Sequence, residues 1–233
     1  MSPAASQARA DRGAAFEALK ATLSAGKLPP PPLEERIATS VTGLDALLGG
    51  GFPLGIVATL EGETGRWSLA AGLVAWMTRR SLVAILDDGG LYPPDLAEAG
   101  ARLDRVLVVP ARKALAIARA ADILLRSRIC RLVLMPAIAL RDAVWTRLAN
   151  LAQRSGVLLL VLGSCAGAAL TAAAGVRLHC GLERALVHGG RGLWGTFAGF
   201  ELCVDVRKHR HAIPGRTARL RIGREEVDYA ALR

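Results

Sequence analysis

The segment Thr42-Gly43-Leu44-Asp45-Ala46-Leu47-Leu48-Gly49-Gly50-Gly51-Phe52-Pro53-Leu54-Gly55 places a short helical stretch directly before three consecutive glycines. Glycine ends helices readily because it adopts the left-handed backbone conformation without steric cost. We therefore predict a short helix that ends at the glycines, after which the chain turns into a strand. A regular alternation of strands and helices follows this segment.

Apolar runs of strand length alternate with longer helical patterns after this point. The predicted strands are 57–61, 82–86, 106–109, 131–135 and 157–162, and the predicted helices are 68–79, 94–103, 113–126 and 140–155. Because these strands are apolar throughout, they predict a mainly parallel central sheet with helices on both faces, a three-layer α/β core. From Val176 onward, shorter segments predict antiparallel edge strands, of which 201–206 and 217–222 are the best patterned.

The N-terminal segment, residues 1–37, differs in pattern from the core, which we assign to residues 38–233. It contains one predicted short helix, 14–23, and the proline run 29–32, which forms a stiff extended spacer. Phe16, Leu19 and Leu23 fall on one face of this helix at positions i, i+3 and i+7. We interpret the helix as a docking element for a partner, and disorder is the alternative interpretation.

The composition bears on location and on metal chemistry. No apolar run reaches membrane-spanning length without a charge or a Gly or Pro break, so we expect a soluble protein with no membrane partner. Residues 1–13 lack the apolar core of a signal peptide, which indicates the cytoplasm. Cysteines 130, 165, 180 and 203 are widely separated, so we expect neither a metal site nor a redox motif.

The formal net charge of +10 has two interpretations. A field of this sign favours nucleic acid or an acidic protein as partner. The other interpretation is a solvated basic surface without a partner. If DNA is bound, the candidate surfaces are the basic stretches 79–80, 207–211 and 216–224.

A glycine turn follows the first predicted strand, in the order Glu61-Gly62-Glu63-Thr64-Gly65-Arg66-Trp67-Ser68. A working phosphate-binding loop has the form G-x-x-x-x-G-K-[ST], in which backbone N–H groups surround the phosphates, Lys neutralises them and the hydroxyl holds Mg²⁺. Here two residues separate Gly62 from Gly65. Arg66 stands in place of Lys, and Trp67 in place of the hydroxyl. Ser68 is out of register as a metal ligand, so the turn predicts a degenerate nucleotide site.

The quoted segment 42–55 resembles the start of the core in RecA and its relatives, where T-G-x-L-D-x-x-L-G-G-G-x-P-x-G precedes the phosphate-binding strand. Residues 167–178 are similar to the RecA pattern G-x-A-L-x-x-x-A-x-V-R-L. The resemblance covers roughly residues 38–223. It implies a RecA-like fold for the core.

The resemblance also assigns the remaining catalytic positions. RecA-like proteins carry a glutamate after the second core strand that activates the attacking water, and Gly89 occupies that position here, beside Asp88. The aspartate associated with Mg²⁺ ends a later strand, where this chain has Met135. Since the phosphate loop, the base and the metal aspartate are all altered, we predict no phosphoryl transfer, no enzymatic activity and no required cofactor. Weak ATP binding remains an alternative.

Two further features of the RecA family bear on partners. Lys208 and Arg210, beside Arg207, lie in a segment similar to the RecA K-N-K-x-x-x-P motif, which implies contact with a neighbouring subunit's nucleotide or with DNA. A basic edge strand is the alternative interpretation. The spaces for the two RecA loops that bind single-stranded DNA, before residue 155 and between residues 162 and 167, are too short for such loops.

Among RecA-like proteins the chain most resembles the ImuA-like group, which has a helical N-terminus and lacks these loops. The resemblance implies a role in SOS-induced, mutagenic translesion DNA synthesis, through binding of an ImuB-type Y-family polymerase-like protein, of RecA, or of DNA by basic surface. The alternatives are a weak ATP-binding recombination or repair ATPase, and a SulA-like inhibitor of cell division.

Overall fold

The computed structural model describes residues 35–39, 41–164, 167–188, 196–210 and 214–223. It divides the chain after Glu35, and all the elements below belong to the unit that begins at Arg36. The predicted helix 14–23, with Phe16, Leu19 and Leu23, lies outside the described residues.

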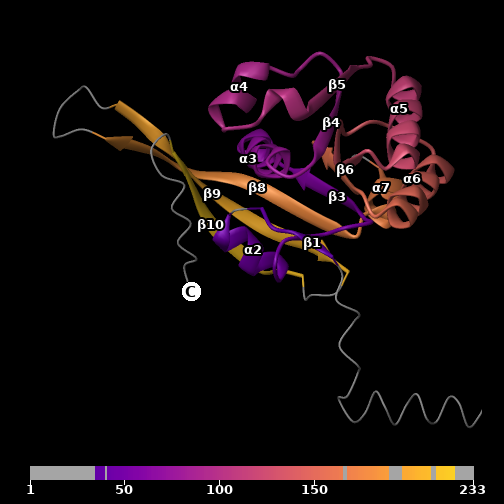
Figure 1. The fold of residues 1–233 in the computed structure, drawn as a ribbon. Coiled ribbons are helices and arrows are strands. Elements are labelled where there is room, and N and C mark those ends of the chain that lie inside the picture. The colour runs from indigo at the N-terminus through magenta and orange to yellow at the C-terminus, as the bar shows by residue number, and fades with distance from the viewer. Residues whose placement is uncertain (1–34, 40, 165–166, 189–195, 211–213, 224–233) are drawn as a thin grey trace, which may run out of the picture. The chain divides into compact units, whose positions relative to one another are not determined.

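The strands of the main sheet lie in the order β10-β9-β8-β3-β7-β6-β4-β5 (Figure 1). Their bounds are β3 (Val57–Glu61), β4 (Leu82–Asp87), β5 (Val106–Pro110), β6 (Cys130–Pro136), β7 (Leu158–Leu162), β8 (Val176–His188), β9 (Thr196–His209) and β10 (Thr217–Gly223). Neighbouring strands from β8 to β5 are parallel, whereas β9 pairs antiparallel with both β8 and β10. The predicted α/β class, with a mainly parallel sheet and antiparallel edge strands, is confirmed.

Helices cover both faces of the parallel part of this sheet. One core contains residues of α2 (Thr42–Leu48), α3 (Arg66–Thr78) and α4 (Pro93–Glu98), and the other contains residues of α5 (Ala114–Ser127), α6 (Asp142–Ser155) and α7 (Ala168–Ala173). Along β6, Leu132 and Leu134 join the first core, while Val133 and Met135 join the second. Because both faces of a central strand are buried, its interior residues 132–135 are apolar at successive positions rather than at alternate ones.

The glycines after α2 each have a geometric role. Gly49 caps the helix in the left-handed conformation, with φ of 70°, and its N–H donates to the carbonyl of Ala46. Gly51, with φ of 111°, passes so close to β1 (Arg36–Ile37) that a Cβ would overlap the carbonyl oxygen of Ile37. β1 pairs there with β2 (Phe52–Pro53). The segment 42–55, which contains β2, therefore joins residues 36–37 to the core.

Three elements differ in length from their predictions. α4 ends at Glu98 rather than at residue 103, because Gly100 adopts a φ of 85° and the chain leaves the helix there. β8 and β9 are much longer than the predicted short segments. Along these strands only one face, with residues such as Leu178 and Leu202, joins a core. None of the described helices is both long enough and apolar enough to cross a lipid bilayer.

Candidate functional site

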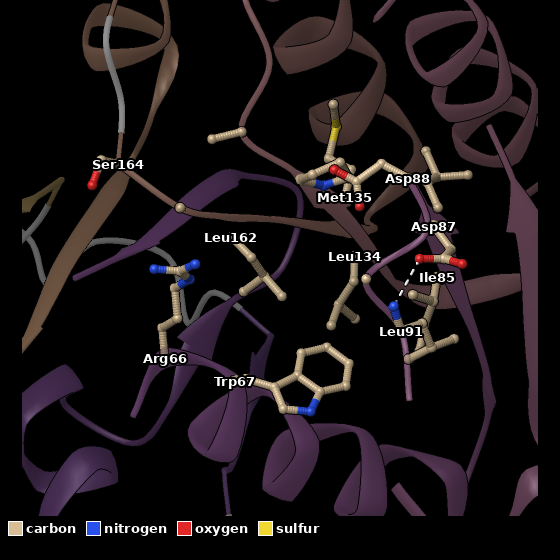
Figure 2. Close-up of a pocket in the computed structure, with 15 residues that line it drawn as sticks. Arg66, Trp67, Ile85, Asp87, Asp88, Leu91, Leu134, Met135, Leu162 and Ser164 are labelled. Atoms are coloured by element: carbon tan, nitrogen blue, oxygen red, sulfur yellow. Dashed lines mark hydrogen bonds between the residues drawn. The ribbon is translucent and has the colours of Figure 1, made fainter. Parts of the chain in front are cut away.

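A cavity of about 410 Å³ opens at the carboxyl ends of β4, β6 and β7, beside the first turn of α3 (Figure 2). The chain runs outward from β3 to β4 and β5 and then returns through β6 and β7 to β8. In open parallel sheets, ligands bind outside the carboxyl ends of the strands near such a reversal. Arg66, Trp67, Asp88 and Met135 line the cavity, so the fold gathers four of the eight predicted nucleotide-site residues in one place.

The loop between β3 and α3 consists of residues 62–65 alone and lies against the antiparallel strands. Gly62 has a φ of 108°, and a Cβ there would overlap the carbonyl oxygen of Cys180 on β8. Gly65 has a φ of 84°, and a Cβ there would overlap the side chain of Leu202 on β9. Both glycines are therefore required by close packing of the loop.

The Arg66 side chain folds back over this loop. Its Nη1 donates a hydrogen bond to the carbonyl oxygen of Gly62. A phosphate-binding loop instead directs its N–H groups and its cation toward the ligand. In this chain the cation is bound to an oxygen of the loop itself.

Trp67 lines the cavity, whereas Ser68 does not. The Trp67 indole Nε1–H donates to Asp95 Oδ2 of α4 at 3.2 Å, and the ring packs against the first core. Figure 2 shows the Trp67 ring and the Arg66 guanidinium extending apart from the start of α3. Ser68 lines a second cavity, between α3, α4 and the β9–β10 strands, and does not line the cavity that contains Asp87. The structure therefore separates Ser68 from the candidate site.

The carboxylates after β4 have different roles. Asp87 Oδ1 accepts hydrogen bonds from the N–H groups of Gly89 and Leu91, both at 2.9 Å, and Figure 2 shows the bond from Leu91. Asp88 is exposed and lines the cavity. Gly89 has a φ of 110°, and a Cβ there would meet no other atom within 4 Å, so backbone conformation rather than lack of space explains the glycine. Asp87 therefore holds the turn, and Asp88 presents its carboxylate to the cavity.

The floor of the cavity is apolar. Met135 is 1% exposed and belongs to the core formed with α5 and α6. Leu134 and Leu162, at the ends of neighbouring strands, line the same floor. In addition to Arg66, the cavity offers the carboxylates of Asp87 and Asp88, the hydroxyl of Ser164 and hydrocarbon, and position 135 supplies no carboxylate.

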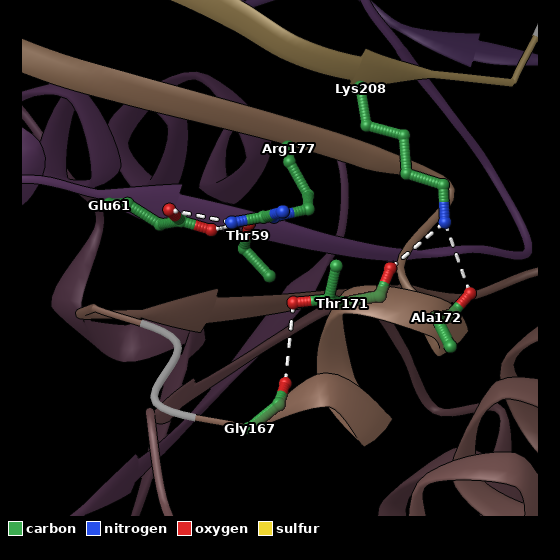
Figure 3. Close-up of polar contacts among 7 residues, drawn as sticks. All are labelled: Thr59, Glu61, Gly167, Thr171, Ala172, Arg177 and Lys208. Atoms are coloured by element: carbon green, nitrogen blue, oxygen red, sulfur yellow. Dashed lines mark hydrogen bonds and ion pairs between the residues drawn. The ribbon is translucent and has the colours of Figure 1, made fainter.

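An ion pair that the sequence does not reveal lies directly before the loop. Arg177 of β8 donates to both carboxylate oxygens of Glu61, from Nε at 2.8 Å and from Nη2 at 3.0 Å (Figure 3). The hydroxyl of Thr59, which is fully buried, donates to Glu61 Oε1 at 2.9 Å. The side chains of Arg177 and Glu61 are 20% and 11% exposed. This network joins the end of β3 to β8.

Of the predicted basic residues, Arg207 and Lys208 lie on β9 and Arg210 follows its end. Lys208 Nζ donates to the carbonyl oxygens of Thr171 and Ala172 at 2.9 and 3.1 Å, and so caps the carboxyl end of α7 (Figure 3). Burial lowers the pKa of Lys208, and the nearby charges of Arg177 and Arg210 lower it further. Arg207 pairs with Asp205 at 3.3 Å, and Arg210 is exposed. These residues do not line the cavity at β4.

Asp87, Glu61 and Arg177 are the functional-site neighbours that sequence reasoning missed. A carboxylate at the end of a predicted strand is a usable signal for Asp87. The Glu61–Arg177 pair joins positions 116 residues apart, so it has no local signal. Within the described part of the chain, no group of three or more His, Cys, Asp or Glu side chains is arranged to hold a metal ion.

Comparisons with known proteins bear on the fold. No model of a protein family matches the chain, and no curated protein matches its sequence. The crystal structure of the RadB recombinase superposes with a TM-score of 0.65 at 19% identity, covering 81% of this chain and 96% of RadB. At this identity the likeness concerns architecture and not activity. The chain therefore has a RecA-like fold.

Proposed function

We propose that this chain is a non-catalytic, ImuA-like accessory protein of damage-induced translesion DNA synthesis. It acts by binding an ImuB-type Y-family polymerase-like protein, RecA, or both, and it needs no nucleotide to do so. The likeness of its fold to that of a recombinase supports a role beside repair and recombination proteins.

The contact between the Arg66 guanidinium and the carbonyl of Gly62 carries this proposal. A bound triphosphate would have to displace this internal contact. It would then lie near Asp87 and Asp88, whose charge repels phosphate oxygens unless a cation lies between them. Met135 offers no oxygen for Mg²⁺, a cation that prefers oxygen ligands. We infer that the site does not hydrolyse ATP and that the fold serves as a binding surface.

Affinity capture with purified proteins tests the proposal. The full-length chain is immobilised and exposed in turn to an ImuB-type protein and to RecA, with and without ATP and Mg²⁺. We expect saturable capture of at least one of them, with the same affinity in both conditions and for Arg66→Ala. Capture of neither protein, or capture that requires ATP, would contradict the proposal.

Weak ATP binding is the second candidate function. The open cavity at the carboxyl ends of the strands, with Arg66 at its rim and Asp88 exposed within it, favours this alternative. It predicts Mg²⁺-dependent binding of a fluorescent ATP analogue that is reduced in Arg66→Ala and in Asp88→Ala. Equal signals from all three proteins would exclude it.

A further inference from the structure

The edge of the sheet opposite the candidate site is rich in arginine. In a parallel sheet every turn from a helix into a strand lies at the amino edge, so the ends of α3, α4, α5 and α6 meet there. The arginines in or beside these turns are Arg79, Arg80, Arg102, Arg105, Arg128, Arg131 and Arg154. Among the described residues of these turns, the only carboxylate is Asp104, which pairs with Arg102 at 2.9 Å.

The strand order arranges these side chains in a row, which we name the arginine edge. Arg154 precedes β7, Arg128 and Arg131 lie at β6, Arg79 and Arg80 precede β4, and Arg102 and Arg105 precede β5. Three strand spacings separate β7 from β5, a span of about 14 Å. Arg131 is exposed although β6 is a central strand, because the pairing with β4 shifts register between Cys130 and Leu132.

Several of these arginines make contacts within the chain. Arg105 Nη1 donates to the carbonyl of Arg79, and Arg128 Nη2 donates to that of Arg154, as expected for cations at helix carboxyl ends. Arg79 and Arg80 instead stack on the ring of Trp76, at 5.5 and 5.1 Å from its centroid. Each guanidinium carries five N–H donors, so these contacts leave donors and positive charge facing outward.

Exposed apolar side chains lie among the arginines. Leu82, Leu103 and Ile129 are 42%, 46% and 54% exposed, and each lies in or beside one of the same turns. A phosphate backbone would neutralise the arginines and leave these side chains in water. A polypeptide that carries both carboxylates and apolar side chains covers both kinds of group.

From this complementarity we propose that the arginine edge binds an acidic, leucine-bearing segment of a partner protein. A groove lined by Arg126, Arg147, Asn150 and Arg154 on α5 and α6 continues the edge at Arg154. An extended segment of about four to five residues spans the row from β7 to β5. The inference rests on the proposed function only in that the partner is a protein, and it places the binding surface away from the degenerate nucleotide site.

Fluorescence anisotropy with the full-length chain tests this surface. The probe is a labelled peptide of about twelve residues in which pairs of Glu alternate with Leu, long enough to span the edge. An oligoglutamate of equal length and an oligothymidylate are the comparison probes. We expect the Glu–Leu peptide to bind most tightly, and Ile129→Ser to weaken only that probe.

Charge variants locate the binding. Arg80→Glu with Arg154→Glu is expected to weaken the Glu–Leu peptide about tenfold or more, whereas the matched pair Arg112→Glu with Arg119→Glu leaves it unchanged. Arg112 and Arg119 are exposed, and both lie outside the arginine edge. If the variant Arg80→Glu, Arg154→Glu does not fold, the variant Arg80→Gln, Arg154→Gln replaces it in the measurement. Equal weakening by the matched pair would overturn the inference, as would tighter binding of the oligothymidylate at the arginine edge.

These outcomes separate the surface from the proposed function. A chain that binds the Glu–Leu peptide through Arg80 and Arg154 but captures neither RecA nor an ImuB-type protein overturns the proposed function and supports the surface. A chain that captures a partner but does not bind the peptide overturns the surface alone.

Discussion

Two charged residues beside the loop 62–65, Arg66 and Glu61, have their hydrogen-bond partners within the chain. Arg66 binds the carbonyl of Gly62, and Glu61 accepts hydrogen bonds from Arg177 and Thr59. The partners of Arg66 and Glu61 are protein groups, so these contacts hold the loop without any ligand. In a phosphate-binding loop, by contrast, the ligand supplies the charge that the loop is built to face.

Removal of one partner of the Glu61–Arg177 pair should be costly. Arg177→Met leaves the largely buried Glu61 carboxylate without its cation, and we expect the free energy of unfolding to fall by about 3 kcal/mol. Urea unfolding followed by circular dichroism measures this. The double variant Glu61→Gln, Arg177→Met should recover part of the loss, because no buried charge remains. A change in Arg177→Met below about 1 kcal/mol would show that the pair is a surface contact.

Cys180 reports on the closure of the loop, since its carbonyl lies against Gly62. Burial raises the pKa of the Cys180 thiol to about 12, and Asp205 and Cys203 contribute. In a variant with Cys130, Cys165 and Cys203 replaced by Ala, we expect no reaction with a thiol reagent at pH 8 until the protein unfolds.

The same thiol gives a pH dependence of stability. Its pKa is higher in the folded chain than the reference value of 9.0, so its contribution to stability is complete below about pH 9 and is lost as the pH rises toward 12. In the thiol-reagent experiment, rapid reaction of Cys180 in the native protein at pH 8 would mean that the loop 62–65 opens readily.

Sequence reasoning applies most directly at positions where a residue type alone decides the chemistry. Arg66, Gly89 and Met135 can each be compared with a required Lys, Glu or Asp, and the fold gathers Arg66 and Met135 at one cavity. It did not find Arg177, because a contact between β3 and β8 depends on the strand order.

At the scale of elements, buried parallel strands were the most predictable. β3 and β7 are runs of mainly apolar residues bounded by turn residues, and they match the predicted ranges to within one residue. β8 and β9 were predicted too short, because Gly181 and Gly199 interrupt their pattern and only one of their faces joins a core. Strand periodicity indicates which face of a strand is buried, but it says little about how many residues the strand contains.

The loop 62–65 should be intolerant of side chains. Gly62 and Gly89 have nearly equal φ values, 108° and 110°, but a Cβ overlaps a backbone carbonyl only at Gly62. We expect Gly62→Ala to destabilise the protein by about 3 kcal/mol and Gly89→Ala by about 1 kcal/mol, from backbone strain alone. Thermal melts of the two variants compare them directly. Equal losses of stability in the Gly62→Ala and Gly89→Ala variants would show that the loop does not pack on β8 as described.

Lys208 of β9 should stabilise the carboxyl end of α7. In Lys208→Met the carbonyl oxygens of Thr171 and Ala172 lose their charged donor, and we expect a loss of about 1 kcal/mol. Hydrogen exchange should accelerate in residues 168–174 more than in α6. Unchanged protection of α7 would leave Lys208 available for the contact with another subunit or with DNA that its sequence motif suggests.

At the scale of the whole core, the two edges of the parallel sheet differ in chemistry. The carboxyl edge carries the cavity with Asp87, Asp88 and an apolar floor, and the amino edge carries arginines with exposed leucine and isoleucine. The sequence predicted the parallel sheet but not the order of its strands. It therefore did not show that arginines from four separate turns form one row.

The proposed absence of ATP hydrolysis is tested most directly by isothermal titration with ATP and Mg²⁺, combined with a phosphate-release assay on the same protein. We predict no saturable heat and no phosphate release above the buffer rate, because Arg66 is bound to Gly62 and Met135 replaces a metal-associated carboxylate. Saturable Mg²⁺-dependent binding with phosphate release, abolished in both Arg66→Ala and Asp88→Ala, would contradict the account.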